Sequence, residues 1–558
     1  YMLTAKVVDN VLYESESYTF EKPEKAEDLY SKELTAKISA ADIEIVTNTI
    51  KPDVTSITSN AYGNDSVKYT DSENREWYSN NIQFNISADD SEVANHHTGI
   101  KSVTATFNGT DVSEKLKGLP VFTAEKVESV NDITFNTEGL NLNEGTNTVE
   151  VTVVNNSGMS STEEYVVYVD KLKPVVSQFK FETVESDVDK VLSFLTFGIY
   201  NNEKIQVTVS AYDVNNAENA KSGIDYLEEN HAEIQLYNGG EKIAADDNSY
   251  SYDENGVLSR TFTLACGETE FKQYMLTAKA WDNVHNVSAS YTFEKPDKAE
   301  DLYSKGLKAK QSDSADTEVV TNTIAPIVTS ITSNTPKEDG ESSVKYTKKA
   351  DKTEWYSGNI EFNISAKDST DDNYHTGIKS VTAKFNGNEV KLNGLPKFTD
   401  KKFESVSDIT FNTEGMTLNE GTNTVEVTVV NNSGVSSTKP YSVYVDKTAP
   451  VITSFDIQNN DKQKIVDLTP EKQHYNYYFQ TDTQVTVNAD DNAEDKGNYS
   501  GIKTIYFRAY DVVTGEEYKS SKNVSTDNDT ASATFTVKAN FKGELYAYAV
   551  DLSLIHIS

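Results

Sequence analysis

The segment Ile82-Gln83-Phe84-Asn85-Ile86-Ser87-Ala88-Asp89 alternates apolar and polar residues over its whole length. A period of two places the apolar side chains on one face of a β-strand and the polar ones on the other. Residues 149–153 alternate in the same way, whereas helical spacing is nearly absent from the chain. Several short strands with one buried face, separated by turn residues, predict antiparallel β-sandwiches.

The same strand leads into a motif that occurs four times. In each copy an apolar strand reaches Ala-x-Asp, a polar loop follows, and Ser or Thr with Gly-Ile opens the next strand. The copies occupy residues 88–100, 211–224, 366–378 and 489–502. Because the framing residues are constant while the loop between them varies in length and chemistry, we interpret the motif first as a structural corner of the sandwich.

Two pairs of distant segments are near copies of each other. Residues 132–162 match residues 408–438 at 28 of 31 positions, and residues 1–32 reappear with changes at 274–305. The repeating unit is therefore about 276 residues long (408 minus 132). This length is too great for one core and fits two domains of about 100 to 150 residues each.

Four apolar strands end in a short polar stretch and a proline, at Pro52, Pro174, Pro326 and Pro450. Proline fixes φ and cannot donate to a sheet ladder, so it ends one sheet and begins another. The Gly of the loop motif follows these prolines after 47, 49, 51 and 51 residues, which predicts one domain per proline. We therefore expect the end of a truncated domain at 1–48, domains at 49–171, 172–322 and 323–447, a truncated domain at 448–551, and at 552–558 a tail that resembles a translated sequencing adapter. The longer domain at 172–322 is expected to contain a short helical insert near 296–305.

The composition excludes several classes of function. The net charge of −37 argues against nucleic-acid binding, because a phosphate-binding surface needs clustered Lys and Arg. Cys266 is the only cysteine, so no domain holds an internal disulfide. No apolar run of 18 residues predicts a membrane span within this sequence. The seven His are scattered, and no H-E-x-x-H, paired Cys or Gly-rich phosphate loop is present, so we expect no catalytic site.

Three longer motifs resemble tandem bacterial immunoglobulin-like domains of large cell-surface proteins. They are D-K-T-A-P-V-I at 446–452, W-Y-S-G-N-I-E-F-N-I-S-A-K-D at 355–368 and L-N-E-G-T-N-T-V-E-V-T-V at 418–429. The resemblance covers residues 1–551 and implies an all-β fold of tandem antiparallel immunoglobulin-like β-sandwich domains in an extended array. It also implies an extracellular or cell-surface location in a bacterium. Some such domains carry an isopeptide bond from Lys to Asn, which needs a buried Lys, Asn and acid that the sequence does not locate.

The acidic loops of the repeated motif are the candidate metal sites. Ca²⁺ takes six to eight oxygen ligands, and clustered Asp could supply them, so calcium is the candidate cofactor although the fold is expected to require none. The alternative is a solvated acidic turn, because no twelve-residue calcium-loop spacing is present and the loops differ in length. His97 and His375, next to the same loops, are expected to be solvated. The candidate ligands are Asp490, Asp491, Asp495, Asp213, Asp368 and Asp90.

One aromatic residue is a candidate ligand platform. Leu276, Ala278 and Ala280 form a small apolar face that is expected to point inward. Trp281 then lies on the opposite face of the strand, where it would stack on a sugar or, alternatively, contact a neighbouring domain.

Together these features predict a non-catalytic, extended stalk, spacer or adhesion region of a bacterial surface or secreted protein. Four domains end to end would reach on the order of 130 Å, at roughly 33 Å for each ten-residue strand. Two alternatives stay open: a module that binds a host or cell-wall glycan or a surface protein, and the accessory region of a surface glycoside hydrolase or other enzyme whose catalytic domain lies outside this sequence.

Overall fold

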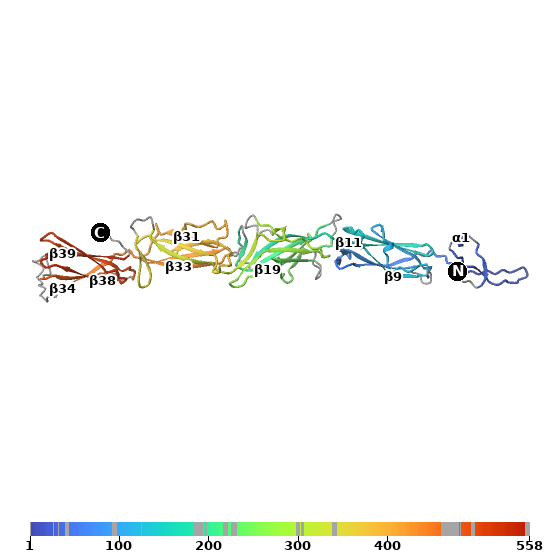
Figure 1. Cartoon of the computed structure of the whole chain (residues 1–558), viewed down its shortest axis with the longest axis horizontal. Helices are drawn as coiled ribbons and strands as arrows, with labels where there is room; N and C mark the ends of the chain where they lie inside the picture. The colour runs from blue at the N-terminus through green and yellow to red at the C-terminus, as the bar shows by residue number, and fades with distance from the viewer. Residues whose placement is uncertain are drawn as a thin grey trace.

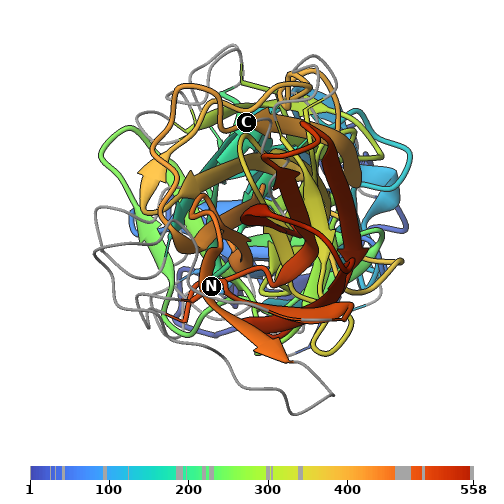
Figure 2. The same cartoon turned by 90° about the vertical axis from the view of Figure 1, so that its left-hand side faces the viewer.

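The computed structural model places four β-sandwiches end to end along one axis (Figure 1). Viewed along that axis, the sandwiches lie one behind another, so the chain forms a single file (Figure 2). The N-terminal part is a small sheet of β1 (Tyr18–Phe20) and β2 (Ala36–Ile38) with the four-residue helix α1 (Asp28–Ser31) between them in sequence. The structure describes residues 2–552 except 26, 32, 40–43, 92–96, 124, 184–192, 196–197, 216–220, 225–231, 297–301, 303–305, 337–342, 459–478, 480 and 493–496.

The first and third sandwiches share one topology, as their similar sequences predict. Each packs a three-stranded sheet against a six-stranded one. In the first sandwich the small sheet has the order β3 (Asp53–Ala61), β6 (Ile82–Asp89), β9 (Ser129–Asn136), and the large sheet the order β4 (Lys68–Thr70), β5 (Glu76–Tyr78), β11 (Ser160–Val169), β10 (Gly145–Asn155), β7 (Ile100–Phe107), β8 (Thr110–Asp111), followed by the 3₁₀ turn η1 (Ser113–Lys115). In the third sandwich the orders are β25 (Ile327–Asn334), β28 (Glu361–Lys367), β31 (Ser405–Asn412) and β26 (Lys345–Thr347), β27 (Glu354–Tyr356), β33 (Ser436–Val445), β32 (Gly421–Asn431), β29 (Ile378–Phe385), β30 (Asn388–Glu389).

The second sandwich is larger because two additional strands join its layers along one edge. β22 (Tyr291–Phe293) pairs with β21 (Leu276–Trp281) and with β23 (Leu307–Gln311), and β23 pairs with β12 (Val175–Thr183) in the opposite layer. The nine-stranded sheet is completed by β17 (Glu241–Ile243), β16 (Glu233–Asn238), β15 (Ile205–Tyr212), β19 (Val257–Leu264) and β18 (Tyr250–Tyr252). A second sheet has the order β13 (Ser193–Leu195), β14 (Gly198–Asn201), β24 (Glu318–Asn322), β20 (Phe271–Tyr274). The helical insert predicted near 296–305 lies mostly outside the described residues.

The fourth sandwich is the smallest, with two three-stranded sheets. Most strand pairs in the chain are antiparallel, as predicted, but each of the first three sandwiches also contains one short parallel pair: β5 with β11, β14 with β24, and β27 with β33. The sheets of the fourth sandwich have the orders β34 (Val451–Gln458), β35 (Thr483–Asp490), β38 (Thr530–Val537) and β37 (Glu517–Asn523), β36 (Ile502–Asp511), β39 (Gly543–Asp551).

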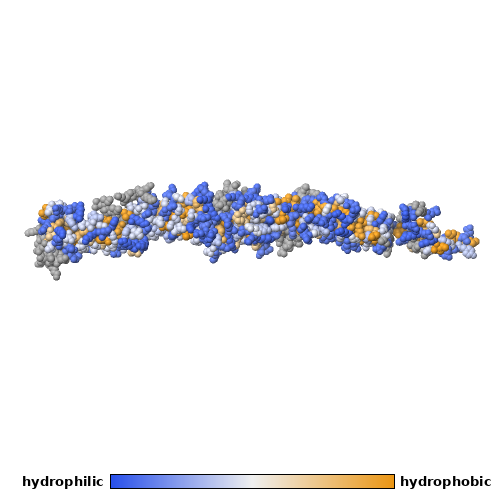
Figure 3. All heavy atoms as spheres, viewed as in Figure 1, coloured by the Kyte–Doolittle hydropathy of each residue, from blue (hydrophilic) through white to orange (hydrophobic). Residues whose placement is uncertain are grey.

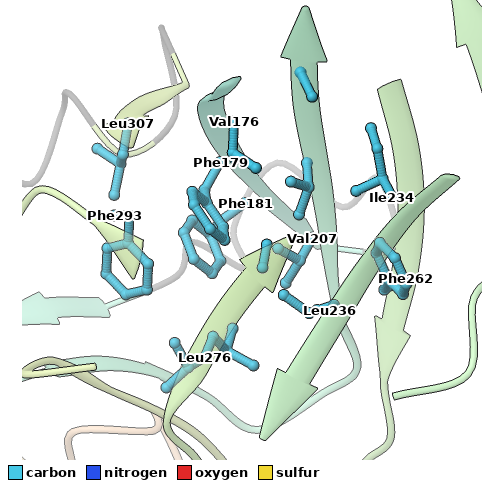
Figure 4. Packing of buried hydrophobic residues seen from close by; sticks show 14 of the residues in the cluster. Val176, Phe179, Phe181, Val207, Ile234, Leu236, Phe262, Leu276, Phe293 and Leu307 are labelled. Carbon is cyan, nitrogen blue, oxygen red and sulfur yellow. The ribbon is translucent and has the colours of Figure 1, made fainter. Parts of the chain in front are cut away.

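Each sandwich buries a hydrophobic core of its own. The alternation of β6 is confirmed, since Ile82, Phe84, Ile86 and Ala88 are all fully buried. Phe84 stacks on Phe135 of β9 with ring centroids 5.0 Å apart. In the second sandwich, residues of both layers converge on one cluster, with Phe179, Phe181 and Phe293 close together (Figure 4). The sandwiches therefore have the interior that an independent domain needs.

A partly buried polar cluster lies beside the core of the first sandwich. The Glu76 carboxylate accepts hydrogen bonds from Ser59, from Lys68 Nζ at 2.5 Å and from the Tyr165 hydroxyl at 2.7 Å. Burial alone would raise the pKa of Glu76, but these hydrogen bonds outweigh it and lower that pKa. The third sandwich repeats the cluster with Ser333, Lys345, Glu354 and Tyr441, and the pKa of Glu354 is lowered for the same reasons.

Replacing both Glu76 and Glu354 by Gln is expected to weaken the acid dependence of stability of the first and third sandwiches. A carboxyl group whose pKa is lowered by folding stabilises the fold at pH values above its pKa in the unfolded chain, which is near 4.5 here. This stabilisation is lost as the pH falls through the pKa of the folded protein. Urea midpoints at about pH 6 and about pH 3 should therefore differ more for the unsubstituted chain than for the variant. Fluorescence of Trp77 and Trp355, in a Trp281→Phe background for both proteins, would report these two sandwiches, and equal pH dependence would contradict the prediction.

The surface is mainly hydrophilic on the face shown in Figure 3, with hydrophobic residues scattered along the array. In the described part of the chain, no helix is long and apolar enough to cross a membrane.

Candidate metal centres at the joints between sandwiches

Four joints connect the successive parts of the array, and each contains one of the predicted prolines. We call them the first joint (48–52), second joint (170–174), third joint (322–326) and fourth joint (446–450). In every joint the side chain four residues before the proline accepts a hydrogen bond from the backbone N–H two residues later. The four bonds are Asn48 Oδ1 with Ile50 N at 2.9 Å, Asp170 Oδ1 with Leu172 N at 3.0 Å, Asn322 Oδ1 with Ile324 N at 2.9 Å and Asp446 Oδ1 with Thr448 N at 3.2 Å.

The second joint brings three buried carboxylates together. Asp170 follows the last strand of the first sandwich, whereas Asp213 and Asp282 follow β15 and β21 of the second sandwich. One carboxylate oxygen from each lies within 4.8 Å of the others, and all three residues are buried. Asp170 Oδ2 also accepts a hydrogen bond across the joint from Ser222 N at 2.7 Å. We call Asp170, Asp213 and Asp282 the second-joint triad.

The fourth joint repeats this arrangement with different strands. Asp446 follows β33 of the third sandwich, Asp491 follows β35, and Asp551 ends β39. These three residues are also buried, with one oxygen from each within 4.8 Å of the others. Asp446 Oδ2 accepts from Ser500 N at 2.7 Å, the counterpart of the Ser222 bond. We call Asp446, Asp491 and Asp551 the fourth-joint triad.

The electrostatics of both triads disfavour three simultaneous negative charges. Burial raises the pKa of Asp213, and the charge of Asp170 raises it further, to about 7. Burial and the charges of Asp213 and Asp170 raise the pKa of Asp282 to about 8. At the fourth joint, burial and the charge of Asp446 raise the pKa of Asp491 to about 7. Lys221 and Lys348 offset only part of this penalty, since the pKa values of Asp213 and Asp491 stay raised. A bound cation would compensate the remaining negative charge.

The triads fit a hard divalent cation in both chemistry and spacing. Calcium is held by carboxylate and carbonyl oxygens at 2.3–2.6 Å, so two ligands on opposite sides of one ion are about 4.8 Å apart. At the fourth joint the Asp491 Oδ2 atom accepts from Gly501 N at 2.8 Å. Its Oδ1 atom is buried without a hydrogen-bond partner. A buried oxygen in that state is an available ligand.

The first and third joints bring one Asp and two Asn residues to the corresponding positions. At the third joint, Asp368 Oδ2 accepts from Gly377 N at 2.7 Å and Oδ1 from Thr376 Oγ1 at 3.3 Å. His375 lies beside it, with Nδ1 3.6 Å from Asp368 Oδ2. At the first joint, His97 Nδ1 lies 3.9 Å from Asp90 Oδ2. The expectation that both His are solvated is wrong, since their side chains are only 15 % and 23 % exposed.

The five predicted metal ligands that the structure describes separate into three groups. Asp213 and Asp491 belong to the triads, whereas Asp90 and Asp368 lie at joints with a single Asp. Asp490 is outside the fourth-joint triad and accepts a hydrogen bond from Asn492 N at 2.8 Å. Asp495 lies outside the described residues. The sequence analysis missed Asp170, Asp282, Asp446 and Asp551.

A signal for the missed residues was present in the sequence. Asp170 and Asp446 both stand in Val-Asp-Lys, four residues before a joint proline. Asp282 and Asp551 both end the pattern Leu-x-Ala-x-Ala-x-Asp, at 276–282 and 545–551. The Asp that each pair of patterns shares lies far in sequence from the loop motif, so local spacing does not connect them.

The three Trp residues have different surroundings. The inward face of β21 is confirmed, because Leu276 and Ala280 are fully buried, while Trp281 is partly exposed. Whether Trp281 contacts a ligand stays a prediction. Trp77 packs against Tyr168 and against Val284 of the second sandwich, and Trp355 occupies the corresponding place at the fourth joint.

Contacts other than the triads also close the joints. At the fourth joint the Lys348 ammonium lies 4.5 Å from the Trp355 ring and 4.2 Å from the ring of Tyr499 in the next sandwich. At the third joint Phe271 stacks on Tyr374, with ring centroids 5.1 Å apart. The three joints that connect the four sandwiches therefore have packed interfaces rather than open linkers.

Several solved structures are similar to the chain at low sequence identity. No protein-family model and no curated protein matches the chain. Among solved structures, an I-band fragment I67–I69 of titin is 10% identical, over 66% of this chain and 93% of that one, with a TM-score of 0.28. The tetra-tandem repeat in the extending region of a large adhesion protein is 14% identical, over 84% and 95%, with a TM-score of 0.24. The full ectodomain (Ig1–Ig3) of mouse nectin-like molecule 4 is 11% identical, over 65% and 94%, with a TM-score of 0.20.

These neighbours are similar to the chain in architecture and carry no inference about what it does. The predicted fold class, an all-β chain of tandem immunoglobulin-like sandwiches, is confirmed.

Proposed function

We propose that this chain is a non-catalytic, extended spacer region of a surface or secreted protein, in which a divalent cation at each Asp triad holds two sandwiches in line. One observation carries the proposal: each triad takes one carboxylate from the preceding sandwich and two from the following one. A cation bound there would connect the two bodies, because it could be coordinated fully only while they keep their relative orientation.

The rest of the molecule suits a spacer. Each sandwich has a hydrophobic core of its own. A further sandwich therefore lengthens the array without changing the cores of the others. The net charge of −37 makes successive sandwiches repel each other and favours an extended chain. Cross-joint hydrogen bonds, such as Asn286 Nδ2 to Asp170 O at 2.9 Å, limit bending further.

Calcium is the cation that the ligand set favours. Carboxylate and carbonyl oxygens are hard ligands, which select Ca²⁺ or Mg²⁺ over thiol- and imidazole-preferring metals. Mg²⁺ needs a near-ideal octahedron at 2.0–2.1 Å and retains several waters. A fully buried triad with ligands up to 4.8 Å apart suits the larger ion and its flexible geometry.

Small-angle X-ray scattering of the full chain tests this function. In about 1 mM Ca²⁺ we expect the maximum dimension to exceed that in chelator, because locked joints keep the sandwiches collinear. The matched control replaces two Asp per triad by Asn, as Asp170→Asn with Asp282→Asn and Asp446→Asn with Asp551→Asn, which copies the residues of the first and third joints. The control should scatter identically in both buffers. An unsubstituted chain whose scattering does not respond to Ca²⁺ would refute the proposal.

A further inference from the structure

The four joints alternate between two chemistries along the chain. Three positions meet at each joint: the residue four before the proline, the Asp of the Ala-x-Asp motif, and a residue at the end of a later strand. We call the first and third of these the outer positions and the second the middle one. Both triad joints have Asp at all three positions, whereas the other two joints have Asn at the outer positions and Asp in the middle. The outer positions are Asn48 and Asn155 at the first joint, and Asn322 and Asn431 at the third. Asn carries no negative charge and presents N–H groups, so each exchange removes a cation ligand and adds a donor.

At the Asn joints the amide forms a bond that a carboxylate cannot form. Asn155 Nδ2 donates to Ile50 O at 3.1 Å, and Asn431 Nδ2 donates to Ile324 O at 3.0 Å. Asn155 ends β10 and Asn431 ends β32, so both bonds tie the joint backbone directly to a core strand of the following sandwich. Asp282 and Asp551, at the same positions in the triad joints, have no N–H to donate when ionised. The Asn joints therefore have a closing hydrogen bond that needs no cation.

The middle Asp also differs between the two kinds of joint. Asp90 Oδ2 accepts from both Thr98 N and Gly99 N. At the second joint the two corresponding N–H groups donate to different carboxylates, Ser222 N to Asp170 and Gly223 N to Asp213. The same division at the fourth joint leaves Asp491 Oδ1 buried and unpartnered. An unsatisfied buried acceptor destabilises the fold, and a cation at the triad would satisfy it.

The third joint has further contacts that need no ion. Lys402 Nζ of the third sandwich pairs with Glu318 Oε1 of the second at 3.0 Å, and these side chains are only 28 % and 13 % exposed. The Phe271 and Tyr374 rings stack across the same joint. The second and third sandwiches are thus joined by an ion pair, a ring pair and an amide hydrogen bond.

We infer that cation binding is confined to the second and fourth joints. The array then consists of two-sandwich units, in which an Asn joint holds the two sandwiches together permanently, and a cation-dependent joint connects each unit to the next. The inference rests on the proposed function and adds the spacing of the cation-dependent joints, which is one per 276-residue repeat. Within the residues that the structure describes, groups of three carboxylates occur at these two joints alone.

Counting bound ions tests the inference on the full chain. Equilibrium dialysis against ⁴⁵Ca²⁺ should give two ions per chain, and one ion each for the Asp170→Asn/Asp282→Asn and the Asp446→Asn/Asp551→Asn variants. The reverse exchange, Asn322→Asp with Asn431→Asp, should raise the count to three, with circular dichroism confirming that the variant is folded. The two loss variants provide the test should the gain variant fail to fold.

The possible counts separate the two proposals. Four ions per unsubstituted chain would overturn the alternation but leave the cation-bound spacer in place. No bound ion would overturn the proposed function itself. A folded gain variant that still binds two ions would show that Asn is not what excludes the cation, and would overturn the inference.

Spin-label distances test the mechanical part. In a Cys266→Ser background, labels at Glu241 and Asn388 span the third joint, and labels at Thr110 and Glu241 span the second; all three positions are exposed hairpin ends. Removal of Ca²⁺ should broaden the distance distribution across the second joint and leave that across the third unchanged. Broadening across both, or across neither, would contradict the two-sandwich unit.

Discussion

Saturating Ca²⁺ is expected to raise the melting temperatures of the sandwiches beside the second and fourth joints by about 5 to 20 °C. A ligand at 100 times its dissociation constant stabilises the folded state by about 2.7 kcal/mol, and each kcal/mol shifts domains of about 100–150 residues by roughly 2–8 °C. The ion is lost when either flanking sandwich unfolds, because each contributes ligands. Calorimetry of the full chain with Ca²⁺ and with chelator measures the shift.

The Asp170→Asn/Asp282→Asn variant provides the control and predicts a reversal of order. In chelator this variant should melt higher than the unsubstituted chain around the second joint, since it lacks the carboxylate repulsion that adds to burial in raising the pKa values of Asp213 and Asp282. In Ca²⁺ the unsubstituted chain should melt higher, because only its triad binds the ion. Melting curves that keep the same order in both buffers would contradict a cation site at this joint.

The strands, and the face of each strand that is buried, could be predicted from the sequence because they depend on local residue patterns. Phe84 lies inward since an alternating strand has only two faces, and the polar flanks decide which one is buried. The exposure of Trp77 and Trp355 could not be predicted in this way. Both are buried at joints, against residues of the next sandwich or of the last strand, and such surroundings depend on how two domains meet.

The candidate metal centres show the same limit more clearly. Asp170, Asp213 and Asp282 stand at the ends of three separate strands, so no local spacing joins them. The sequence predicts ligands within one loop, including Asp490 before Asp491 and Asp495 four residues after it. The structure instead brings together the Asp that closes each Ala-x-Asp and the ends of two other strands. The Asp that closes the Ala-x-Asp motif, which we interpreted as part of a structural corner, is therefore the motif residue that belongs to each triad.

Truncation of one core aromatic is expected to have the largest effect on stability, and to remain within one sandwich. Phe362→Ala removes a fully buried ring that stacks on Phe411 at 4.8 Å and meets Tyr441 edge-on at 6.3 Å. Such a substitution typically costs about 3–5 kcal/mol. We expect the transition of the third sandwich alone to shift in calorimetry of the full chain, with those of the first and second unchanged.

The chain contains its own matched control for this prediction. Phe84 occupies the same position in the first sandwich, stacked on Phe135 and edge-on to Tyr165. Phe84→Ala should therefore cost nearly the same free energy, and the double variant should show the sum, because distant sites with no shared partners add within about 0.3–0.5 kcal/mol. If either substitution lowered every transition together, the array would unfold as one cooperative body. The joints would then do more than align the sandwiches, and chelation of Ca²⁺ should restore independent unfolding at the second and fourth joints but not at the third.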